Sequence, residues 1–296
     1  MNIGILASGG DGAGMNYCLF NLYKYLYKNN KVILFNRGYK GLIENDILNF
    51  DYKFLNKHKN DGGIIIKTSR CPEFKTEEGK QKGIDTIKEN NIDCLIVLGG
   101  NGSLRGAQEL KELGINVMFI PCTIDNDVAG SEYCIGFNTA CYNCTNFVLH
   151  VNDTMKSFNR TCIYEAMGRE CPQIAIEVAK NVNASYAYID ETCTQEQCIQ
   201  TLKESLKTND APIVILRENL INILDLKQKI INDLKVDVRT CIVVYVQRGG
   251  KPTKIEKNNA KNFAKNCANQ INSNNLNKAI IVKNSAFCAV DITKIA

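Results

Sequence analysis

The hydrophobic residues of this chain fall into short continuous runs, each followed by a glycine-rich or polar turn. The first runs are Ile3–Leu6, Val32–Phe35, Cys94–Leu98 and Val117–Ile120. Runs without alternating polar residues are typical of strands that are covered on both faces. Between the runs lie charge-rich segments with helical character, such as residues 77–90. This alternation of strands and helices predicts parallel βαβ units.

A second series of the same kind follows. It comprises a predicted helix at Gln173–Ala179 and predicted strands at Tyr186–Ile189, Ile213–Leu216 and Cys241–Val246. A long Asn- and Lys-rich helix over residues 254–274 and a last strand over 278–282 complete the pattern. We therefore expect an α/β protein made of two Rossmann-like halves, with a changeover near Gly136.

The composition excludes several classes of protein. Hydrophobic residues make up 45% and charged residues 23% of the 296 residues, which is typical of a globular domain protein. The net charge of +5 suits anionic small molecules, and the Lys and Arg residues form no block that would indicate a nucleic-acid partner. No run approaches the ~18 apolar residues that cross a bilayer, and the start has no signal-peptide pattern. We expect a cytoplasmic protein with no membrane partner.

The 14 cysteines are then expected to be reduced thiols, because cytosolic disulfides are rare. Many lie inside apolar runs, where cysteine acts as a small hydrophobic residue. Cys141 and Cys144 have the spacing of metal ligands, but no second pair at zinc spacing accompanies them. Buried spectator thiols are the favoured interpretation.

Two glycine-rich turns follow predicted strands, at the sheet edge where open α/β proteins bind ligands. They are Gly9–Gly14, which leads into a helix, and Gly99–Ser103. Backbone N–H groups and a helix N-terminus at such turns can bind an anion. Each could also be a plain tight turn, and neither matches a Walker loop or a dinucleotide fingerprint. Two such turns in one sheet favour phosphate binding.

A third segment, Pro121–Asp127, follows the next strand and places Asp125 and Asp127 two residues apart. In an extended backbone their side chains would face the same side. One carboxylate could accept a proton while the other holds Mg²⁺, unless the segment is only a solvated acidic turn. The chain has only two histidines, and neither has a recognisable catalytic setting. We therefore expect a carboxylate to act as the general base.

Several arginines lie near predicted strand ends or helix starts, namely Arg70, Arg160, Arg169, Arg239 and Arg248. Arginine suits bidentate phosphate recognition, although a surface ion pair remains open for any single one. Arg248 stands beside Gly249 and Gly250 at a predicted strand end. A ligand could approach it closely there.

Taken together, these segments resemble the ATP-dependent 6-phosphofructokinases over nearly the whole chain. The matching stretches are Ser8–Asp11, Gly14–Asn16, Gly38–Leu42, Gly62–Gly63, Thr68–Arg70, Gly99–Ser103, Thr123–Asp127, Ile135–Phe137, Asp153–Thr154, Glu165–Arg169 and Val246–Gly250. The order of the T-I-D-N-D, M-G-R and Q-R-G-G elements is highly specific.

The resemblance implies two similar three-layer α/β domains with the active site in the cleft between them. The nucleotide-binding domain would be 1–136 plus 249–285, and the sugar-phosphate-binding domain 137–248 plus 286–296. The implied reaction is the glycolytic transfer of a phosphoryl group from ATP to the 1-hydroxyl of fructose 6-phosphate, with Mg²⁺. A homo-oligomer, dimer or tetramer, is also implied.

The resemblance also implies residue roles. Asp125 would be the base, Thr123 would steady the transferring phosphoryl group, and Arg169 would act at the reacting centre. The ATP contacts would be Gly10, Tyr39, Arg70, Cys71, Gly102 and Ser103. The sugar phosphate would contact Met167, Gly168, Arg169, Glu191, Tyr245 and Arg248, with Arg160 and Arg239 reaching a neighbouring subunit's site. Asn101 and Asp127 would serve the metal.

Some positions depart from the family pattern. Asn101 stands where the family usually has an Asp, and Tyr245 replaces a His. These departures leave open a non-catalytic or weakly active subunit, or a sugar-phosphate sensor. A pyrophosphate-dependent variant is disfavoured because Gly102 and Cys122 are small and uncharged and leave room for adenosine. A nucleotide-binding protein with another acceptor is a further alternative. Phe20 and Asn152 replace basic effector-site residues, although Lys24 keeps its charge, so we expect weak or no activation by ADP.

Overall fold

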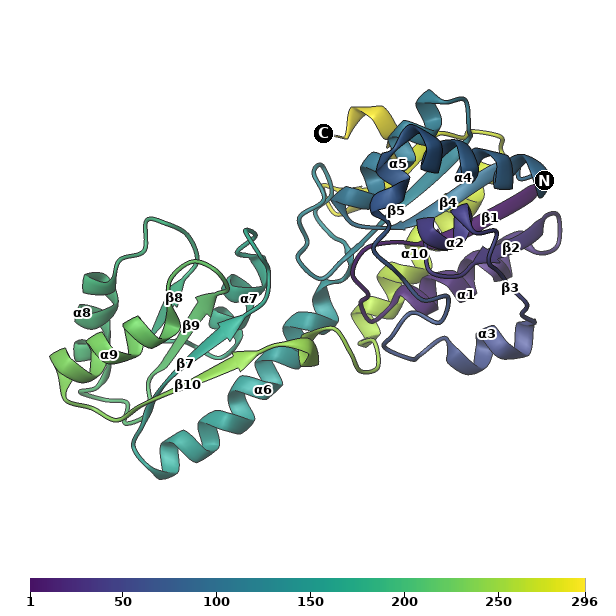
Figure 1. The fold of residues 1–296 in the computed structure, drawn as a ribbon. Helices are drawn as coiled ribbons and strands as arrows, with labels where there is room; N and C mark the ends of the chain where they lie inside the picture. Colours follow the sequence, from purple (N-terminus) through teal and green to yellow (C-terminus); the bar gives the residue numbers. More distant parts are fainter. Residues whose placement is uncertain (296) are drawn as a thin grey trace. The chain divides into compact units, whose positions relative to one another are not determined.

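The computed structural model describes residues 1–295, which form two compact units. The first unit contains residues 1–139 and 248–295, and the second contains residues 140–247. The second unit is therefore one continuous stretch, whereas the first is made of two stretches that are far apart in sequence. Figure 1 labels the elements of both units.

The first unit is built on a mixed sheet with two antiparallel edges. Its spatial order is β12 (Ala286–Asp291), β11 (Lys278–Lys283), β5 (Val117–Thr123), β4 (Cys94–Gly99), β1 (Asn2–Ala7), β2 (Lys31–Phe35) and β3 (Ile47–Leu48), with β6 (Ile135–Gly136) paired to β5. The central strands from β11 to β2 are parallel, while β12 and β3 run antiparallel to their neighbours. The carboxyl ends of β1, β4 and β5 therefore meet at one edge.

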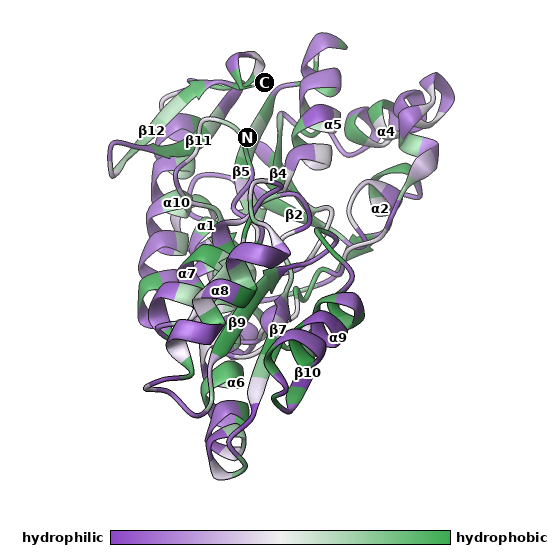
Figure 2. Ribbon diagram, turned by 90° about the vertical axis from the view of Figure 1, so that its left-hand side faces the viewer, coloured by the Kyte–Doolittle hydropathy of each residue, from purple (hydrophilic) through white to green (hydrophobic). Residues whose placement is uncertain are grey.

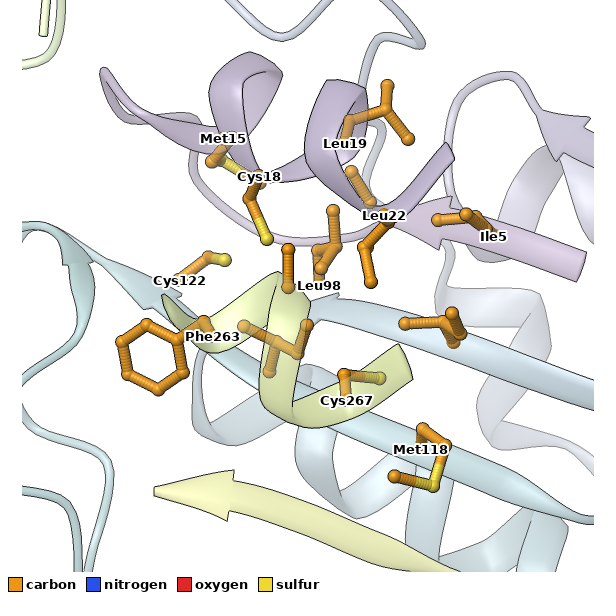
Figure 3. Packing of buried hydrophobic residues seen from close by; sticks show 14 of the residues in the cluster. Ile5, Met15, Cys18, Leu19, Leu22, Leu98, Met118, Cys122, Phe263 and Cys267 are labelled. Atoms are coloured by element: carbon orange, nitrogen blue, oxygen red, sulfur yellow. The ribbon is translucent and has the colours of Figure 1, made fainter. Parts of the chain in front are cut away.

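Both faces of this sheet are covered by helices because its strands send apolar side chains to either side. Ile96 and Leu98 face a core shared with α1 (Met15–Leu26) and α10 (Lys254–Asn272), and Figure 3 shows this packing. Leu95 and Val97 face a second core. The helices of that core are α2 (Tyr39–Ile43), α4 (Glu77–Glu89) and α5 (Asn101–Glu112). The short α3 (Tyr52–His58) packs beside α1.

The second unit has an all-parallel sheet in the order β10 (Val238–Val243), β7 (Thr161–Ala166), β9 (Ile213–Arg217) and β8 (Tyr186–Tyr188). The helices α8 (Gln195–Ser205) and α9 (Ile223–Leu234) pack on one face. Figure 1 places α6 (Phe137–Ser157) and α7 (Gln173–Asn181) on the other. Figure 2 shows β9 as largely hydrophobic, as expected for a strand between two layers, and only its last residue, Arg217, is charged. The predicted α/β class is confirmed.

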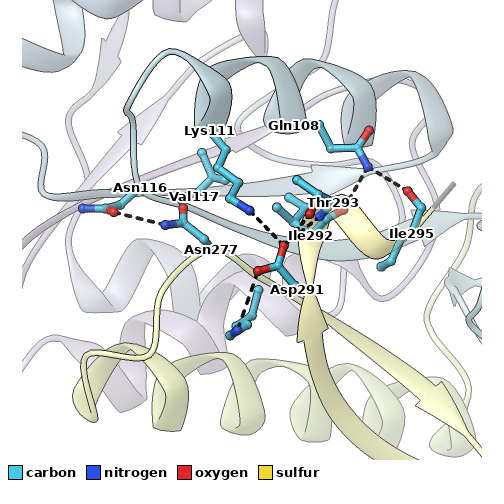
Figure 4. A network of polar contacts seen from close by, with 10 residues as sticks. Gln108, Lys111, Asn116, Val117, Asn277, Asp291, Ile292, Thr293 and Ile295 are labelled. Atoms are coloured by element: carbon cyan, nitrogen blue, oxygen red, sulfur yellow. Dashed lines mark hydrogen bonds and ion pairs between the residues drawn. The ribbon is translucent and has the colours of Figure 1, made fainter.

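Residues 286–295 belong to the first unit, which corrects the expectation that the segment 286–296 joins the sugar-phosphate domain; residue 296 lies outside the described residues. β12 follows β11 through a tight turn at Asn284 and Ser285 and pairs with it along its whole length. Figure 4 shows how side chains of α5 fix the following residues. Gln108 Nε2 donates to the carbonyl groups of Ile292 and Ile295, and Lys111 Nζ lies 2.9 Å from Asp291 Oδ1.

Most predicted strands and helices form within a few residues of their expected bounds, with one clear exception. The expected strand at Cys241–Val246 instead spans Val238–Val243. Val244 and Val246 are 53% and 51% exposed, and a short 3-10 helix at Tyr245–Gln247 follows the strand. An apolar run therefore continues past the end of the strand, where nothing in this unit's sheet covers it. The final hairpin strand β12 was not expected either.

Burial explains most of the cysteines. Those in the interior are Cys18, Cys94, Cys122, Cys134, Cys141, Cys144, Cys162, Cys198 and Cys267. Burial raises the pKa of the Cys94 thiol to about 12, which keeps it in the unreactive form. Within residues 1–295, no group of three or more His, Cys, Asp or Glu residues could hold a metal ion. Among the same residues, no helix is both long enough and apolar enough to cross a membrane.

Candidate active site

The turn after β1 is shaped by glycine and held by a neighbouring arginine. Gly9 and Gly14 adopt φ angles of 89° and 105°, which favour glycine. The Arg248 guanidinium donates to the Asp11 carbonyl oxygen at 3.1 Å. A Cβ on Gly10 would lie 2.5 Å from Arg248 Nη1, so a larger residue here would require the guanidinium to shift. The turn therefore places a guanidinium beside the N-terminus of α1.

The turn after β4 lies against the first turn. A Cβ on Gly9 would be 3.5 Å from Ser103 Oγ, and a Cβ on Gly99 would be 2.5 Å from the Ser8 carbonyl oxygen. Gly102, in contrast, faces open space, with no atom within 4 Å of a Cβ added there. α5 begins at Asn101, and among the described residues no side chain caps this helix start. Its partly positive N-terminus is therefore open to an anion.

Tyr39 packs against the turn after β4 and contacts its backbone. Its hydroxyl donates to the Ser103 carbonyl oxygen at 2.8 Å, and its ring stacks on Phe74 with centroids 4.1 Å apart. The side chain is only 5% exposed. The structure therefore gives Tyr39 a packing role, and its expected contact with ATP stays a prediction.

The acidic segment after β5 forms a tight turn at the same edge. Thr123 Oγ1 accepts from the Asp125 N–H at 3.2 Å, and Asp125 is 5% exposed. Asn126 has a φ of 55° and accepts from the Cys134 N–H at 2.7 Å, which ties the turn to the segment leading into β6. Asn and Asp tolerate this left-handed conformation better than other non-glycine residues. Asp125 and the exposed Asp127 are therefore held on a fixed turn.

Asn101 and Asp127, the two residues that the resemblance assigns to the metal, contact each other. Asn101 Nδ2 donates to Asp127 Oδ2 at 3.0 Å and to the Asp127 carbonyl oxygen at 3.1 Å. A carboxylate and an amide oxygen are hard oxygen donors of the type that Mg²⁺ prefers. Mg²⁺ usually takes one or two protein ligands and completes its shell with water and substrate phosphates. The donor set therefore fits Mg²⁺ with few protein ligands.

The loop that carries Arg70 and Cys71 also reaches the first turn. Thr68 Oγ1 donates to the Gly9 carbonyl oxygen at 2.7 Å. A Cβ on Gly62 would be 2.6 Å from the Gly250 backbone, so the start of this loop lies against the Q-R-G-G segment. Arg70 itself is exposed. The first unit thus gathers the loops of Arg70 and Arg248 around one sheet edge.

A second cluster of predicted residues lies at the carboxyl end of β7, in the second unit. The turn Met167–Arg169 has positive φ at Gly168 (143°) and at Arg169 (53°). Met167 N–H donates to Gln247 Oε1 at 3.2 Å. The N–H groups of Gly168 and Arg169 donate to Glu218 Oε1 at 3.0 and 2.8 Å. The three successive backbone N–H groups are thus fixed by the residue that directly follows β9 and by a residue of the 3-10 helix after β10.

Two other residues expected at the sugar phosphate, Glu191 and Tyr245, are largely exposed. The Glu191 side chain is 83% exposed and pairs with Arg217 Nη2 at 3.1 Å. Tyr245 is 76% exposed. Their expected sugar-phosphate contacts stay predictions. The acid bound to the turn is Glu218, which the sequence analysis missed, although it lies two residues beyond the end of a predicted strand.

Arg160 and Arg239 lie at the opposite end of the same sheet. Both pair with Asp237, Arg160 Nε with Oδ2 at 2.6 Å and Arg239 Nη1 with Oδ1 at 2.5 Å. Arg160 precedes β7, while Arg169 follows it. Six strand residues at about 3.3 Å each separate these arginines by on the order of 20 Å. The second unit therefore keeps Arg160 and Arg239 away from its own Arg169.

A buried carboxylate, Glu256, connects the elements behind the first unit's turns. Its oxygens accept from the N–H groups of Gly136 (2.9 Å) and Thr139 (3.1 Å) and from the Tyr133 hydroxyl (2.9 Å). Burial raises the pKa of Glu256 to about 7, although these hydrogen bonds act in the opposite direction. A Cβ on Gly14 would be 2.7 Å from Glu256 Cγ. The sequence analysis did not single out this residue.

Comparisons with known proteins identify relatives of this chain over nearly its whole length. A family model described as "Phosphofructokinase" matches residues 2–271. The chain is 39% identical over 254 residues to the ATP-dependent 6-phosphofructokinase of Clostridioides difficile, covering 85% of this chain and 80% of that protein. It is 34% identical over 293 residues to the protein of the same name from Clostridium botulinum, covering 98% of this chain and 92% of that one.

Solved structures of similar fold come from yeast and from bacteria. The chain superposes on phosphofructokinase from Saccharomyces cerevisiae with a TM-score of 0.91 and 25% identity, covering 99% of this chain but 44% of that longer chain. It superposes on a pyrophosphate-dependent phosphofructokinase from Marinobacter aquaeolei with a TM-score of 0.86, 16% identity and coverage of 100% and 83%. The second likeness shows the shared fold.

Proposed function

We propose that this chain, which belongs to the phosphofructokinase family, transfers a phosphoryl group from ATP to the 1-hydroxyl of fructose 6-phosphate. The observation that best supports this is Asp125, a buried carboxylate fixed on a turn beside two glycine-rich turns. Its relatives from Clostridioides difficile and Clostridium botulinum are named ATP-dependent 6-phosphofructokinases.

In this proposal the first unit binds ATP. Backbone N–H groups near Gly10 and Gly102, the N-termini of α1 and α5, and the Arg70 guanidinium would face the phosphates. Ser103 and Cys71 line the same loops. The open space over Gly102 and the neutral side chain of Cys122 favour an adenosine over pyrophosphate alone. Mg²⁺ would be held by Asp127 and Asn101 and would neutralise phosphate charge.

Asp125 would accept the proton of the sugar's 1-hydroxyl. Thr123, whose hydroxyl oxygen already accepts from the Asp125 N–H, would donate its own hydroxyl proton toward the transferring group. Phosphoryl transfer needs alignment and charge neutralisation more than covalent chemistry, and these side chains supply both. A positioned general base typically contributes on the order of 10²–10⁴ in rate.

The sugar phosphate would be held by Met167, Gly168, Arg169 and Arg248. Arg160 and Arg239 are remote from their own Arg169, which supports the proposal that they act on a neighbouring subunit's site in a homo-oligomer. Asp237 keeps the two guanidinium groups together on one side of the sheet. The exposed Tyr245, beside Val244 and Val246, is compatible with such an interface.

The test is a coupled assay with ATP, Mg²⁺ and fructose 6-phosphate. Asp125→Asn should lower kcat by about 10³ while the melting temperature stays near that of the wild type. Asp85→Asn, which alters an exposed carboxylate on α4, is the matched control and should retain activity. Near-normal turnover of the Asp125→Asn variant would show that Asp125 is not the general base. A faster reaction with pyrophosphate than with ATP would show that pyrophosphate is the phosphoryl donor.

One observation favours a second candidate, a weakly active subunit or sugar-phosphate sensor. The Asn101 amide donates to the very carboxylate that is proposed to hold Mg²⁺. A neutral amide also leaves this site with one negative charge fewer than an aspartate would. Wild-type protein that binds fructose 6-phosphate but turns it over only after Asn101→Asp would establish this alternative.

A further inference from the structure

Arg217 is a buried cation for which neither the sequence pattern nor the proposed chemistry has a role. It is the last residue of β9 and is 5% exposed. The parallel register pairs it with Ala166 at the end of β7, directly before the turn Met167–Arg169. The Glu218 N–H then donates to the Ala166 carbonyl oxygen at 2.9 Å, which extends the pairing to the turn itself.

The guanidinium completes the set of contacts on that turn. Arg217 Nη1 donates to the Arg169 carbonyl oxygen at 2.9 Å. Gln247 and Glu218 already accept from the three N–H groups of the turn. Arg217 therefore fixes the remaining polar group of Arg169's backbone, its carbonyl oxygen. With both peptide groups fixed, the direction of the Cα–Cβ bond of Arg169 is fixed as well.

The backbone conformation of the turn explains why it needs these contacts from Arg217 and Glu218, which we call the clamp. Arg169 has a φ of 53°, which costs an L-residue other than glycine roughly 1 kcal/mol or more. Such a conformation persists only when the surroundings over-determine it. Arg217, at the end of β9, holds the Arg169 carbonyl group, and the next residue, the anionic Glu218, holds the N–H groups of Gly168 and Arg169.

The cost of the arrangement indicates that it serves more than stability. Within the described residues, Arg217 Nε is buried without a hydrogen-bond partner, which is unfavourable for a charged group. Its carboxylate partner Glu191 is 83% exposed, so solvent screens their attraction. At 5% exposure Arg217 has little surface with which to contact a ligand itself. Its effect must pass through the residues it holds.

We infer that Arg217 is a positioning residue that orients Arg169 for the phosphate of the sugar substrate. The inference rests on the proposed function, in which Arg169 contacts that phosphate. Loss of Arg217 should then weaken sugar-phosphate binding and leave nucleotide binding intact, because the nucleotide residues lie in the first unit.

The first test compares the KM values for fructose 6-phosphate and for ATP in the variants Arg217→Met and Arg217→Lys. The matched control is Lys207→Met, which removes an exposed cation beyond the end of α8. Arg217→Met should raise the KM for fructose 6-phosphate at least 10-fold and change the KM for ATP less than 2-fold. Arg217→Lys, which can still donate to the Arg169 carbonyl oxygen, should recover part of the loss. Lys207→Met should match the wild type. Equal effects on both KM values would overturn the inference.

The second test is a double-mutant comparison, because a merely structural effect would add to the loss of Arg169. Arg217→Met should lower kcat/KM at least 10-fold in the wild-type background but less than 2-fold in the Arg169→Met background. A full additional loss in that background would show that Arg217 does not act through Arg169. If Arg217→Met fails to fold, the same comparison is made with Arg217→Lys.

A third measurement separates this inference from the proposed function. Hydrogen exchange of residues 166–172 reports the clamp without any turnover, and it should be faster in Arg217→Met than in Lys207→Met. Unchanged exchange would overturn the inference even in an active enzyme. Wild-type protein that neither binds nor phosphorylates fructose 6-phosphate would instead refute the proposed function, while the exchange result would still decide whether Arg217 holds the turn.

Discussion

The buried carboxylate of Glu256 should make the stability of the first unit depend on pH in a way that can be calculated. Its pKa is about 7 in the folded protein against an ordinary value of 4.5, because burial disfavours the charged form. Between these values the folded state holds a proton that the unfolded state has released. The free energy of unfolding therefore falls as the pH rises through this window.

The size of the effect follows from the same two values. One proton of difference changes the free energy of unfolding by about 1.4 kcal/mol per pH unit, so the whole window corresponds to about 3 kcal/mol. Glu256→Gln removes the titration. The amide also presents an N–H₂ group to donors such as Gly136 and Tyr133, so the variant should be less stable at low pH.

The assay is urea denaturation of both proteins between about pH 4 and 8 at constant ionic strength, which spans both pKa values. The difference in stability between wild type and Glu256→Gln should shrink by about 3 kcal/mol across the full window, mostly below pH 7. Other titrating groups are present in both proteins and cancel in the difference. Parallel pH profiles would refute the reasoning, because they would mean that Glu256 titrates alike in the folded and unfolded states.

Three further predictions concern the proposed metal site, a closely packed glycine and the effector site. Asn101→Asp should lower the Mg²⁺ concentration for half-maximal activity several-fold, since it adds a carboxylate beside Asp127, and an unchanged Mg²⁺ titration would contradict the assignment. Gly41→Ala should destabilise the first unit by about 3 kcal/mol or more, because its Cβ would lie 1.6 Å from the Asn36 carbonyl oxygen; Gly102→Ala, in open space, should leave the melting temperature nearly unchanged. ADP should activate the enzyme less than about 2-fold in a kinetic titration, and strong activation would show that the replaced effector positions still bind nucleotide.

The sequence was most informative where structure and chemistry are local. The turns after β1, β4 and β5 were predicted because apolar runs end in glycine or in Thr123–Asp127, and adjacent parallel strands place such ends at one edge. Family membership, first inferred from the order of these motifs, is confirmed by the matching family model. The roles of the individual residues stay predictions.

Contacts between remote segments were the part that could not be predicted. Glu218 and Arg217 meet the Arg169 turn only because β7 and β9 pair in one register, which a single sequence does not reveal. Glu191 was assigned to the sugar phosphate from motif order, whereas its side chain is largely exposed. The predicted strand at Cys241–Val246 lies three residues beyond the observed β10, because residues 244–246 are hydrophobic and yet exposed. Hydrophobicity alone does not distinguish these two environments.

The insertion of residues 140–247 within the first unit has a consequence for synthesis on the ribosome. The central strand β5 has its neighbour β11, and α1 its packing partner α10, only after the entire second unit has been translated. Until then, the face of α1 that packs on α10 and the edge of β5 that pairs with β11 lack their partners. The second unit, being continuous, can complete its sheet first, so the half that emerges earliest is the last to finish folding.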